Sequence, residues 1–333
     1  MPTPIAPQKP LRIAILAYDG CMGLEIFGIT DLLLIANHVA QAMRGRGEKA
    51  FDVRLVSTQG RSVQAAGGIT LGAQSARGKF DWLIVPGLEV VQGTQWPTKL
   101  ARLQPELAYI ERSFARGTQI ASVCVGSFLL GEAGLLQGRH ATTAWIMARE
   151  LAARYPQAKV NPHAVLLEDG AIVTSGAITA TFDLALHLIK RRLGAEVASA
   201  TARIALLPKP RSSQAPYVDA QLIAPPAAHA ASFSANVAQW LNKRMQEPFS
   251  LPLLAQAFHV SPRTLMRRVK AETGQSPLTL LQQARVQHAK QLLQSTAWSI
   301  AKIVEAVGYS DVATFSRLFV REVGQTPARY RAS

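Results

Sequence analysis

The chain has 333 residues, a formal net charge of +15 and a pI near 10.3, and 48% of its residues are hydrophobic. That length favours two domains, the excess of positive charge favours an anionic partner, and two cysteines are too few for a disulfide framework. No apolar run reaches the ~18 residues of a membrane span, the N-terminus lacks the apolar segment of a signal peptide, and no Cys/His cluster has metal-site spacing. We therefore expect a soluble cytoplasmic protein without membrane, metal or cofactor.

The N-terminal part of the chain alternates apolar strands with helices. Strands are predicted at residues 12–18, 51–57 and 80–87, a strand followed by a turn at 119–126, and helices at 24–43, 100–117, 128–136 and 179–194. Asp169-Gly170 separates two apolar runs and predicts a hairpin over residues 165–176. Apolar strands separated by helices are typical of a doubly wound, mostly parallel sheet covered on both faces. We expect this α/β domain to span residues 11–207.

Two predicted strand ends carry reactive groups. Cys124 lies between Ser122 and Gly126 on a predicted strand-to-helix turn, which resembles a nucleophile elbow. Glu25 begins the first long helix, just after the first strand. Ligands of parallel sheets bind at the carboxyl ends of strands, so the two side chains could lie together there. The helix N-terminus is expected to lower the thiol pKa, and an ionised Glu25 to raise it; alternatively, Cys124 is a small buried hydrophobic residue.

Residues 11–207 resemble the PfpI/ThiJ, glutamine-amidotransferase-like superfamily, which implies a flavodoxin-like fold. The resemblance lies in residues 24–28, 85–87, 123–145 and 170–189. The pattern is similar to that of GlxA-like regulators, which join this domain to an AraC-type one. The resemblance implies homodimerisation and a small-molecule effector pocket. We place that pocket near Glu25, Gly87, Cys124, Val125 and Ser175.

The departures from the superfamily pattern bear on catalysis. Hydrolytic members carry His directly after the Cys, where this chain has Val125, and Ala144 stands where related regulators often have His. Of the seven histidines, only His163 lies near the predicted hairpin. Since a Cys nucleophile needs a base or a strongly lowered pKa, we interpret the pocket as a sensor rather than an active site. A Cys-dependent hydrolase or hydratase and a redox sensor that uses Cys124 remain the alternatives.

Residues 208–232 are rich in Pro, Ala, Ser and Gln without periodicity, and predict a partly ordered linker. The segment that follows, residues 233–333, contains one unit twice. Arg267 pairs with Arg317, Gly274 with Gly324 and Pro277 with Pro327, all at an offset of 50 residues.

Each copy predicts helix, tight turn and helix. The first helices are expected at 251–258 and 300–307, the second at 263–272 and 313–322, and a linking helix at 278–294. Ser261 and Asp311 are good N-caps, and Gly274 and Gly324 good C-terminal caps. A basic outward face on the second helix is typical of helix-turn-helix units, whose second helix enters the major groove.

Residues 233–333 resemble the DNA-binding domain of the AraC/XylS family, which implies double-stranded DNA as the partner. The base-reading residues are then expected at Arg263, Thr264, Met266 and Arg267 in the first unit, and at Ala313, Thr314, Ser316 and Arg317 in the second. The two arginines at the 50-residue offset are the best candidates for bidentate guanine contacts, while the Ala and Met could meet a thymine methyl. This segment holds 13 Lys/Arg against 5 Asp/Glu, so basic charge concentrates where phosphates would bind. We therefore predict a sequence-specific transcriptional regulator rather than an enzyme.

Overall fold

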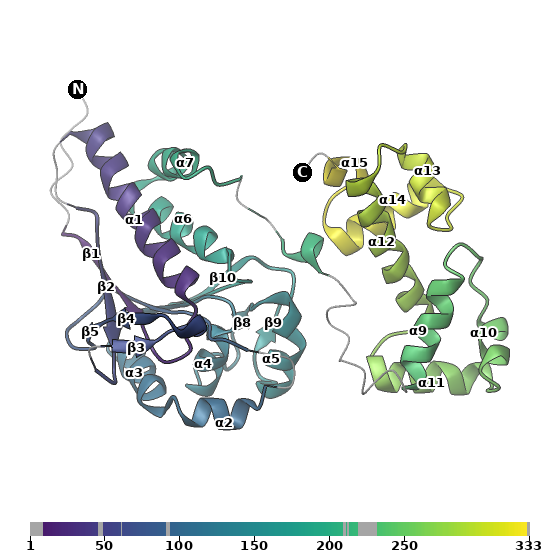
Figure 1. Cartoon of the computed structure of the whole chain (residues 1–333), viewed down its shortest axis with the longest axis horizontal. Helices are drawn as coiled ribbons and strands as arrows, with labels where there is room; N and C mark the ends of the chain where they lie inside the picture. The colour runs from purple at the N-terminus through teal and green to yellow at the C-terminus, as the bar shows by residue number, and fades with distance from the viewer. Residues whose placement is uncertain are drawn as a thin grey trace. The chain divides into compact units, whose positions relative to one another are not determined.

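The computed structural model describes residues 9–45, 49–60, 62–90, 94–208, 211, 213–218 and 232–331 (Figure 1). The chain divides into two compact units, Met1–Gln214 and Ala215–Ser333. This division lies inside the stretch that the sequence predicts as a linker, and a short 3-10 helix, Ala215–Tyr217, follows it directly.

The first unit is built on one seven-stranded sheet, and only its β10–β11 pair is antiparallel. Its strands, in spatial order, are β10 (Leu166–Asp169), β11 (Ile172–Ser175), β7 (Gln119–Ser122), β6 (Trp82–Val85), β1 (Leu11–Leu16), β2 (Phe51–Ser57) and β5 (Gln74–Ser75). Two small two-stranded sheets pair β3 (Ser62–Gln64) with β4 (Thr70–Gly72) and β8 (His140–Ala141) with β9 (Lys159–Val160). The predicted α/β fold with a mostly parallel sheet is confirmed.

Helices cover both faces of the sheet (Figure 1). One face carries α1 (Gly23–Arg44), α6 (Ala180–Leu193) and α7 (Ala195–Ile204), and the other α2 (Trp96–Ala101), α3 (Gln104–Ala115), α4 (Gly126–Glu132) and α5 (Ala148–Arg154). Because both faces are covered, every residue of β6 is buried, and β1 is apolar and buried from Ile13 to Leu16.

The helix predicted over residues 100–117 is wrong in its continuity. The chain forms α2 and α3 instead, with a break at Arg102 and Leu103. Pro105 lies at the start of α3, where its missing N–H costs nothing, and it restricts the residue before it. The short strands β3, β4, β5, β8 and β9 and the helices α5 and α7 carry weaker sequence patterns and were not predicted.

The first helix tests the expectation that nothing spans a membrane. Within α1, Gly23–Met43 is long and apolar enough to cross a bilayer by length and hydropathy alone. However, 44% of its most apolar stretch is buried in the fold, where α1 packs against β2, α6 and α7. A core helix of a folded domain passes the same test, so this helix gives no reason to place the chain in a membrane.

The second unit is helical. It consists of α9 (Phe233–Lys243), α10 (Leu251–Ala257), α11 (Pro262–Thr273), α12 (Pro277–Ser295), α13 (Ile300–Ala306), α14 (Val312–Val323) and α15 (Pro327–Arg331). The α10–α11 and α13–α14 pairs are the two predicted helix-turn-helix units, and each has its own small apolar core. The long helix α12 contributes Leu281 to the first core and Ala289 and Leu293 to the second, so it connects them as expected. Helices α9 and α15 were not predicted.

Candidate nucleic-acid interface and effector pocket

Local sequence signals fix both second helices. Ser261 accepts a hydrogen bond from the Thr264 N–H (3.2 Å) and caps α11, and Asp311 accepts from the Thr314 N–H (2.7 Å) and caps α14. Both helices end at a left-handed glycine, Gly274 and Gly324. The predicted caps are therefore confirmed.

The turn between α13 and α14, in the second helix-turn-helix unit, requires glycine for two reasons. Gly308 has a φ of 81°, and a Cβ at this position would lie 2.6 Å from the carbonyl oxygen of Met245. In the first helix-turn-helix unit, His259 takes the equivalent left-handed conformation, with a φ of 51°. The backbone of the turn is thus alike in both units although their residues differ.

The predicted base-reading residues lie opposite the two cores. Leu265 and Val269 of α11 and Phe315, Leu318 and Phe319 of α14 are buried, as predicted. The residues that face away from these cores, exposed or half-buried, are Arg263, Thr264, Met266, Arg267, Ala313, Thr314, Ser316 and Arg317. The Arg317 guanidinium donates to the Thr314 hydroxyl (3.3 Å), which orients it along the helix. All eight are available to a ligand, and their contacts with bases stay a prediction.

Not every basic residue predicted on the outer faces is free to meet DNA. Arg268 stacks over the ring of Phe233, with 3.9 Å between the guanidinium carbon and the ring centroid. Arg321 pairs with the neighbouring Glu322 (3.1 Å). These two side chains make contacts within the domain, whereas no ion pair is described for Arg263, Arg267 or Arg317 on the outward faces.

Sequence reasoning missed a buried arginine that joins the two helix-turn-helix units. Arg285 of α12 is 6% exposed and donates to the carbonyls of Met245 (2.8 Å) and Glu247 (2.7 Å) in the segment before α10. Its guanidinium also lies 5.0 Å from the ring centroid of Tyr309, in the turn of the second unit. The spacing Leu281, Arg285, Ala289 places it on the buried face of α12 and could have revealed it. It fastens both helix-turn-helix units to one helix.

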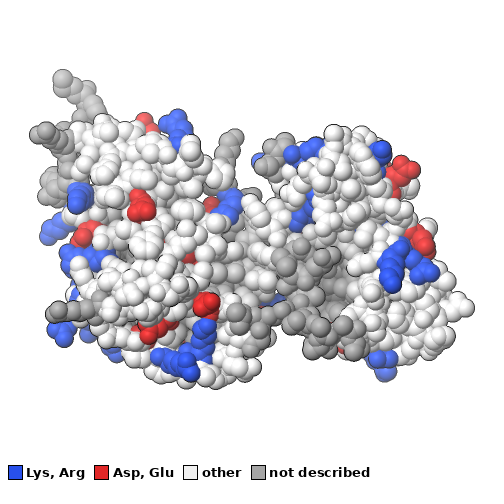
Figure 2. Space-filling model, in the orientation of Figure 1, with Lys and Arg blue, Asp and Glu red and all other residues white. Residues whose placement is uncertain are grey.

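Charge agrees with a polyanionic partner. The C-terminal residues 233–333 carry 13 Lys/Arg against 5 Asp/Glu. Figure 2 shows Lys and Arg side chains on the surface of this unit. Exposed cations of this kind bind phosphates through counterion release, which gives affinity without base specificity.

In the α/β unit, Met1–Gln214, Cys124 lies on a strained turn between β7 and α4. Its φ is 54°, a left-handed conformation that non-glycine residues rarely adopt. The turn packs so closely that a Cβ at Gly126 would lie 2.4 Å from the carbonyl oxygen of Val85. The predicted elbow geometry is therefore present, and Cys124 is a half-buried residue within it.

Glu25 and Cys124 meet at the carboxyl end of the sheet. A Cβ at Gly87 would lie 3.2 Å from the Cβ of Cys124 and 3.3 Å from both carboxylate oxygens of Glu25. The Gly87 N–H donates to Glu25 Oε2 (2.5 Å). Burial raises the pKa of Glu25 to about 7, against smaller lowering effects of Gly87 and the thiol. The pair is thus brought together as predicted.

The expectation that the helix N-terminus would lower the pKa of the Cys124 thiol is wrong. Burial, followed by the negative charge of Glu25, raises that pKa to about 12. Helix α4 has only seven residues, and its first turn does not offset these effects. Because the thiolate is the reactive form, the thiol is a weak nucleophile at neutral pH.

The other predicted pocket residues support the turn rather than line an opening. Glu25, Gly87, Val125 and Ser175 are all buried, and the Ser175 hydroxyl donates to the carbonyl of Ser122 (3.1 Å). Among the described residues no hydrogen bond joins a histidine side chain to Cys124. Instead, the hydroxyl of Thr143 donates to the Cys124 carbonyl (2.8 Å), a contact that sequence reasoning missed.

Two surface cavities lie elsewhere on this unit. One, of about 610 Å³, is next to the amino ends of β6 and β7, and its basic residues are Arg77, Lys79, Arg112 and Arg116. The other, of about 370 Å³, is lined by Asn161, His163 and Arg211 among others. Neither cavity is lined by Glu25 or Cys124.

A flavodoxin-like domain with a cysteine on a strained turn, followed by two helix-turn-helix units, defines a two-part architecture. A model of the DJ-1/PfpI family matches residues 12–191, and a model described as a helix-turn-helix domain matches residues 254–333. The chain therefore belongs to the DJ-1/PfpI family and carries a C-terminal helix-turn-helix domain of the AraC type.

Relatives share both parts. The chain is 28% identical over 331 residues to the HTH-type transcriptional regulator GlxA of Rhizobium meliloti, covering 96% of this chain and 95% of the relative. It is 24% identical to the HTH-type transcriptional regulator GbdR of Pseudomonas aeruginosa, over 96% of this chain and 84% of the relative. A crystal structure of a protein from Vibrio parahaemolyticus, 20% identical, has the same α/β fold over 59% of this chain and 99% of that chain, with a TM-score of 0.50.

Proposed function

We propose that the protein is a transcriptional regulator that binds a specific double-stranded DNA site through α11 and α14. The observation that carries this proposal is the pair of helix-turn-helix units, each with an exposed arginine on its second helix, fastened to one helix by Arg285. Two recognition helices held on one rigid element suit successive major grooves, about 34 Å apart in B-DNA. Relatives that match both domains are named transcriptional regulators. Such a regulator works in the cytoplasm.

We further propose that the first unit senses a small molecule and is not an enzyme. Cys124 is the part of the predicted pocket that reaches the surface, and Glu25, Gly87, Val125 and Ser175 hold it in place. The raised pKa of its thiol favours sensing over a Cys-dependent hydrolase or hydratase, and also over an oxidation sensor, because both alternatives need the thiolate. An effector that favours one conformation would change DNA affinity through a coupling of about 1–3 kcal/mol.

The experiment that tests the regulator is a selection of sheared genomic DNA by the purified full-length chain at ~150 mM salt, which suppresses purely electrostatic binding. We expect a small set of sites that share a sequence and lose binding when that sequence is scrambled. Enrichment that follows only fragment length, with or without added metabolite extract, would contradict sequence-specific binding.

We also propose a homodimer that uses the exposed face of α1. Leu24, Phe27 and Leu34 lie three and seven residues apart, so they form one stripe, and each is more than 40% exposed. A stripe of large apolar side chains on a monomer surface is typical of a protein–protein interface.

A charge on this stripe is expected to prevent dimerisation. Phe27→Glu places a carboxylate at the centre of an apolar contact, where it would be desolvated without a partner. Sedimentation velocity of the full chain should then change from dimer to monomer, while Ile69→Glu, an equally exposed apolar position outside α1, should leave the dimer intact. A Phe27→Glu protein that sediments like the wild type would place the interface elsewhere.

A further inference from the structure

The segment that leads out of the first unit is bound into it next to the Cys124 turn. We call its described residues, Arg211, Ser213 and Gln214, the strap. Gln214 is 5% exposed although it lies in a stretch that the sequence predicts as a linker. Its backbone N–H donates to the carbonyl of His163 (2.7 Å), and the Ser213 hydroxyl donates to the same oxygen (3.0 Å).

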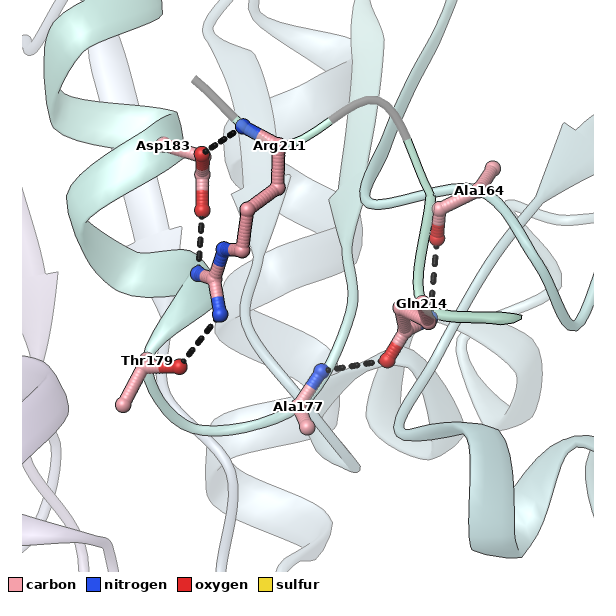
Figure 3. A network of polar contacts seen from close by, with 6 residues as sticks. All are labelled: Ala164, Ala177, Thr179, Asp183, Arg211 and Gln214. Carbon is pink, nitrogen blue, oxygen red and sulfur yellow. Dashed lines mark hydrogen bonds and ion pairs between the residues drawn. The ribbon is translucent and has the colours of Figure 1, made fainter. Parts of the chain in front are cut away.

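The Gln214 side chain makes hydrogen bonds to loop backbone, using both of its N–H donors and its carbonyl oxygen. Its Nε2 donates to the carbonyls of Thr143 (3.0 Å) and Ala164 (2.8 Å), and its Oε1 accepts from the N–H of Ala177 (2.9 Å). Figure 3 shows the amide between Ala164 and Ala177. A buried amide that is satisfied in this way holds one position, since leaving would strand three polar groups.

These contacts close a ring of hydrogen bonds through Cys124. The Thr143 hydroxyl donates to the Cys124 carbonyl (2.8 Å), and the Cys124 N–H donates to the carbonyl of Gly176 (2.9 Å), the residue before Ala177. Gln214 therefore binds both loops that fix the backbone of the Cys124 turn. A displacement of that turn must move Thr143 or Gly176, and with them the acceptor and donor of the Gln214 amide.

Gly176 is shaped for this side chain. A Cβ there would lie 2.4 Å from the amide carbon of Gln214, although the φ of Gly176 does not itself demand glycine. The absence of a side chain thus serves the strap, not the loop. Glycine is required at position 176 only while Gln214 occupies this docked position.

A second anchor precedes Gln214. The guanidinium of Arg211 pairs with the Asp183 carboxylate and donates to the Thr179 hydroxyl (2.8 Å), as Figure 3 shows. Thr179 and Asp183 lie at the start of α6, directly after the loop that contains Gly176 and Ala177. Both anchors of the strap therefore bind the same loop-to-helix segment beside the Cys124 turn.

The chain passes to the second unit immediately after the strap. Gln214 is the last residue of the first unit and Ala215 the first residue of the second. Within the second unit, Gln287 and Lys290 of α12 donate to the carbonyl of Val218. The connection is thus held on the first unit up to Gln214 and on the DNA-binding unit by Val218.

We propose that the strap is an intramolecular docking segment that reads the state of the Cys124 turn. Binding of an effector at Cys124, which alkylation of the thiol imitates in the tests below, displaces the loops at Thr143 and Gly176, releases Gln214, and frees the segment that leads to the DNA-binding unit. Gln214 is a positioning residue in this scheme. The role in DNA binding rests on the proposed function, whereas the link between Gln214 and Cys124 does not.

The first test needs no DNA and uses reciprocity: if the Cys124 turn controls the strap, the strap must control the turn. N-ethylmaleimide alkylation of Cys124 in the full chain is timed by mass spectrometry, which separates it from the buried Cys21. We expect Gln214→Met, similar in size but without the three hydrogen bonds, to speed alkylation at least about fivefold. Gly176→Ala should do the same by displacing Gln214. The exposed Gln104→Met, on α3, is the control and should react like the wild type.

The reverse direction is read by hydrogen exchange. Alkylated wild-type protein should exchange faster than unmodified protein in peptides that cover residues 208–218, and alkylation of the Gln214→Met protein should add nothing further. Equal alkylation rates for wild type, Gln214→Met and Gly176→Ala would overturn the proposal. If one of the two variants does not fold, the other and the wild-type exchange data still decide.

A last arm separates the strap from the proposed function. On a site recovered from genomic selection, alkylation should change the affinity of the wild type and not that of Gln214→Met. Failure of the selection would refute the regulator while the alkylation and exchange results still judge the strap. A recovered site whose affinity responds equally in both proteins would refute the strap alone.

Discussion

Replacement of both Arg267 and Arg317 by alanine is expected to weaken binding to the specific DNA site by about 2–6 kcal/mol. Each side chain is exposed at the outward face of its recognition helix, and a bidentate arginine–guanine contact contributes about 1–3 kcal/mol of discrimination. The two positions lie in different units, so their effects should be close to additive. Neither side chain packs in a core, so the fold should keep its stability.

The measurement is a fluorescence anisotropy titration at ~150 mM salt on a selected site and on its single-base variants. Each single variant should lose discrimination at its own base pair and keep it elsewhere. A matched control, Arg77→Ala with Arg116→Ala, removes two charges from the first unit and should alter affinity little. Equal affinity of the double variant and the wild type for the selected site would refute the assigned roles.

The two helix-turn-helix units could be predicted almost completely, because their signals are local. The caps Ser261 and Asp311 and the left-handed glycines Gly274 and Gly324 act within one turn of their helices, and the 50-residue offset shows the unit twice. Arg285 escaped because its partners, Met245 and Glu247, lie about forty residues away. An arginine on an apolar helix face signals a buried partner but does not identify it.

In the first unit the sheet and the meeting of Glu25 with Cys124 could be predicted, since parallel strands bring their carboxyl ends to one edge. The chemistry of the thiol could not, because the depth of burial sets its pKa and only the structure gives that depth. Gln214 could not be found either. The stretch around Gln214 has the composition of a linker, and the residue to which its side chain donates, Thr143, is 71 residues away in the sequence.

The second large effect concerns the buried carboxyl. Glu25 titrates with a pKa of about 7 in the folded chain, against a usual value of 4.5. Between those two values the folded state binds the proton more strongly than the unfolded state, so the Glu25 contribution to stability falls as pH rises. The ionisation of buried Glu25 lowers the free energy of unfolding by about 3 kcal/mol at most. This full loss is reached above pH 7 and is absent below pH 4.5.

Glu25→Gln should remove this dependence. Glutamine cannot ionise, and its carbonyl oxygen can still accept the Gly87 N–H. The difference in unfolding free energy between the variant and the wild type should grow in favour of the variant by about 2.5 kcal/mol from pH 5 to pH 8. Urea unfolding reports the change when it is followed by Trp82, Trp96 and Trp145 fluorescence in a Trp240→Phe/Trp298→Phe background, which silences the second unit.

The comparison with wild type isolates Glu25. His187, whose pKa is lowered chiefly by burial, titrates in both proteins and cancels. The Cys124 thiol, with a pKa of about 12, stays protonated throughout this range. The exposed Glu111→Gln, on α3, should run parallel to the wild type. If Glu25→Gln also runs parallel, the carboxyl is ionised across the whole range, and it then holds the Cys124 turn as an anion rather than as a neutral acid.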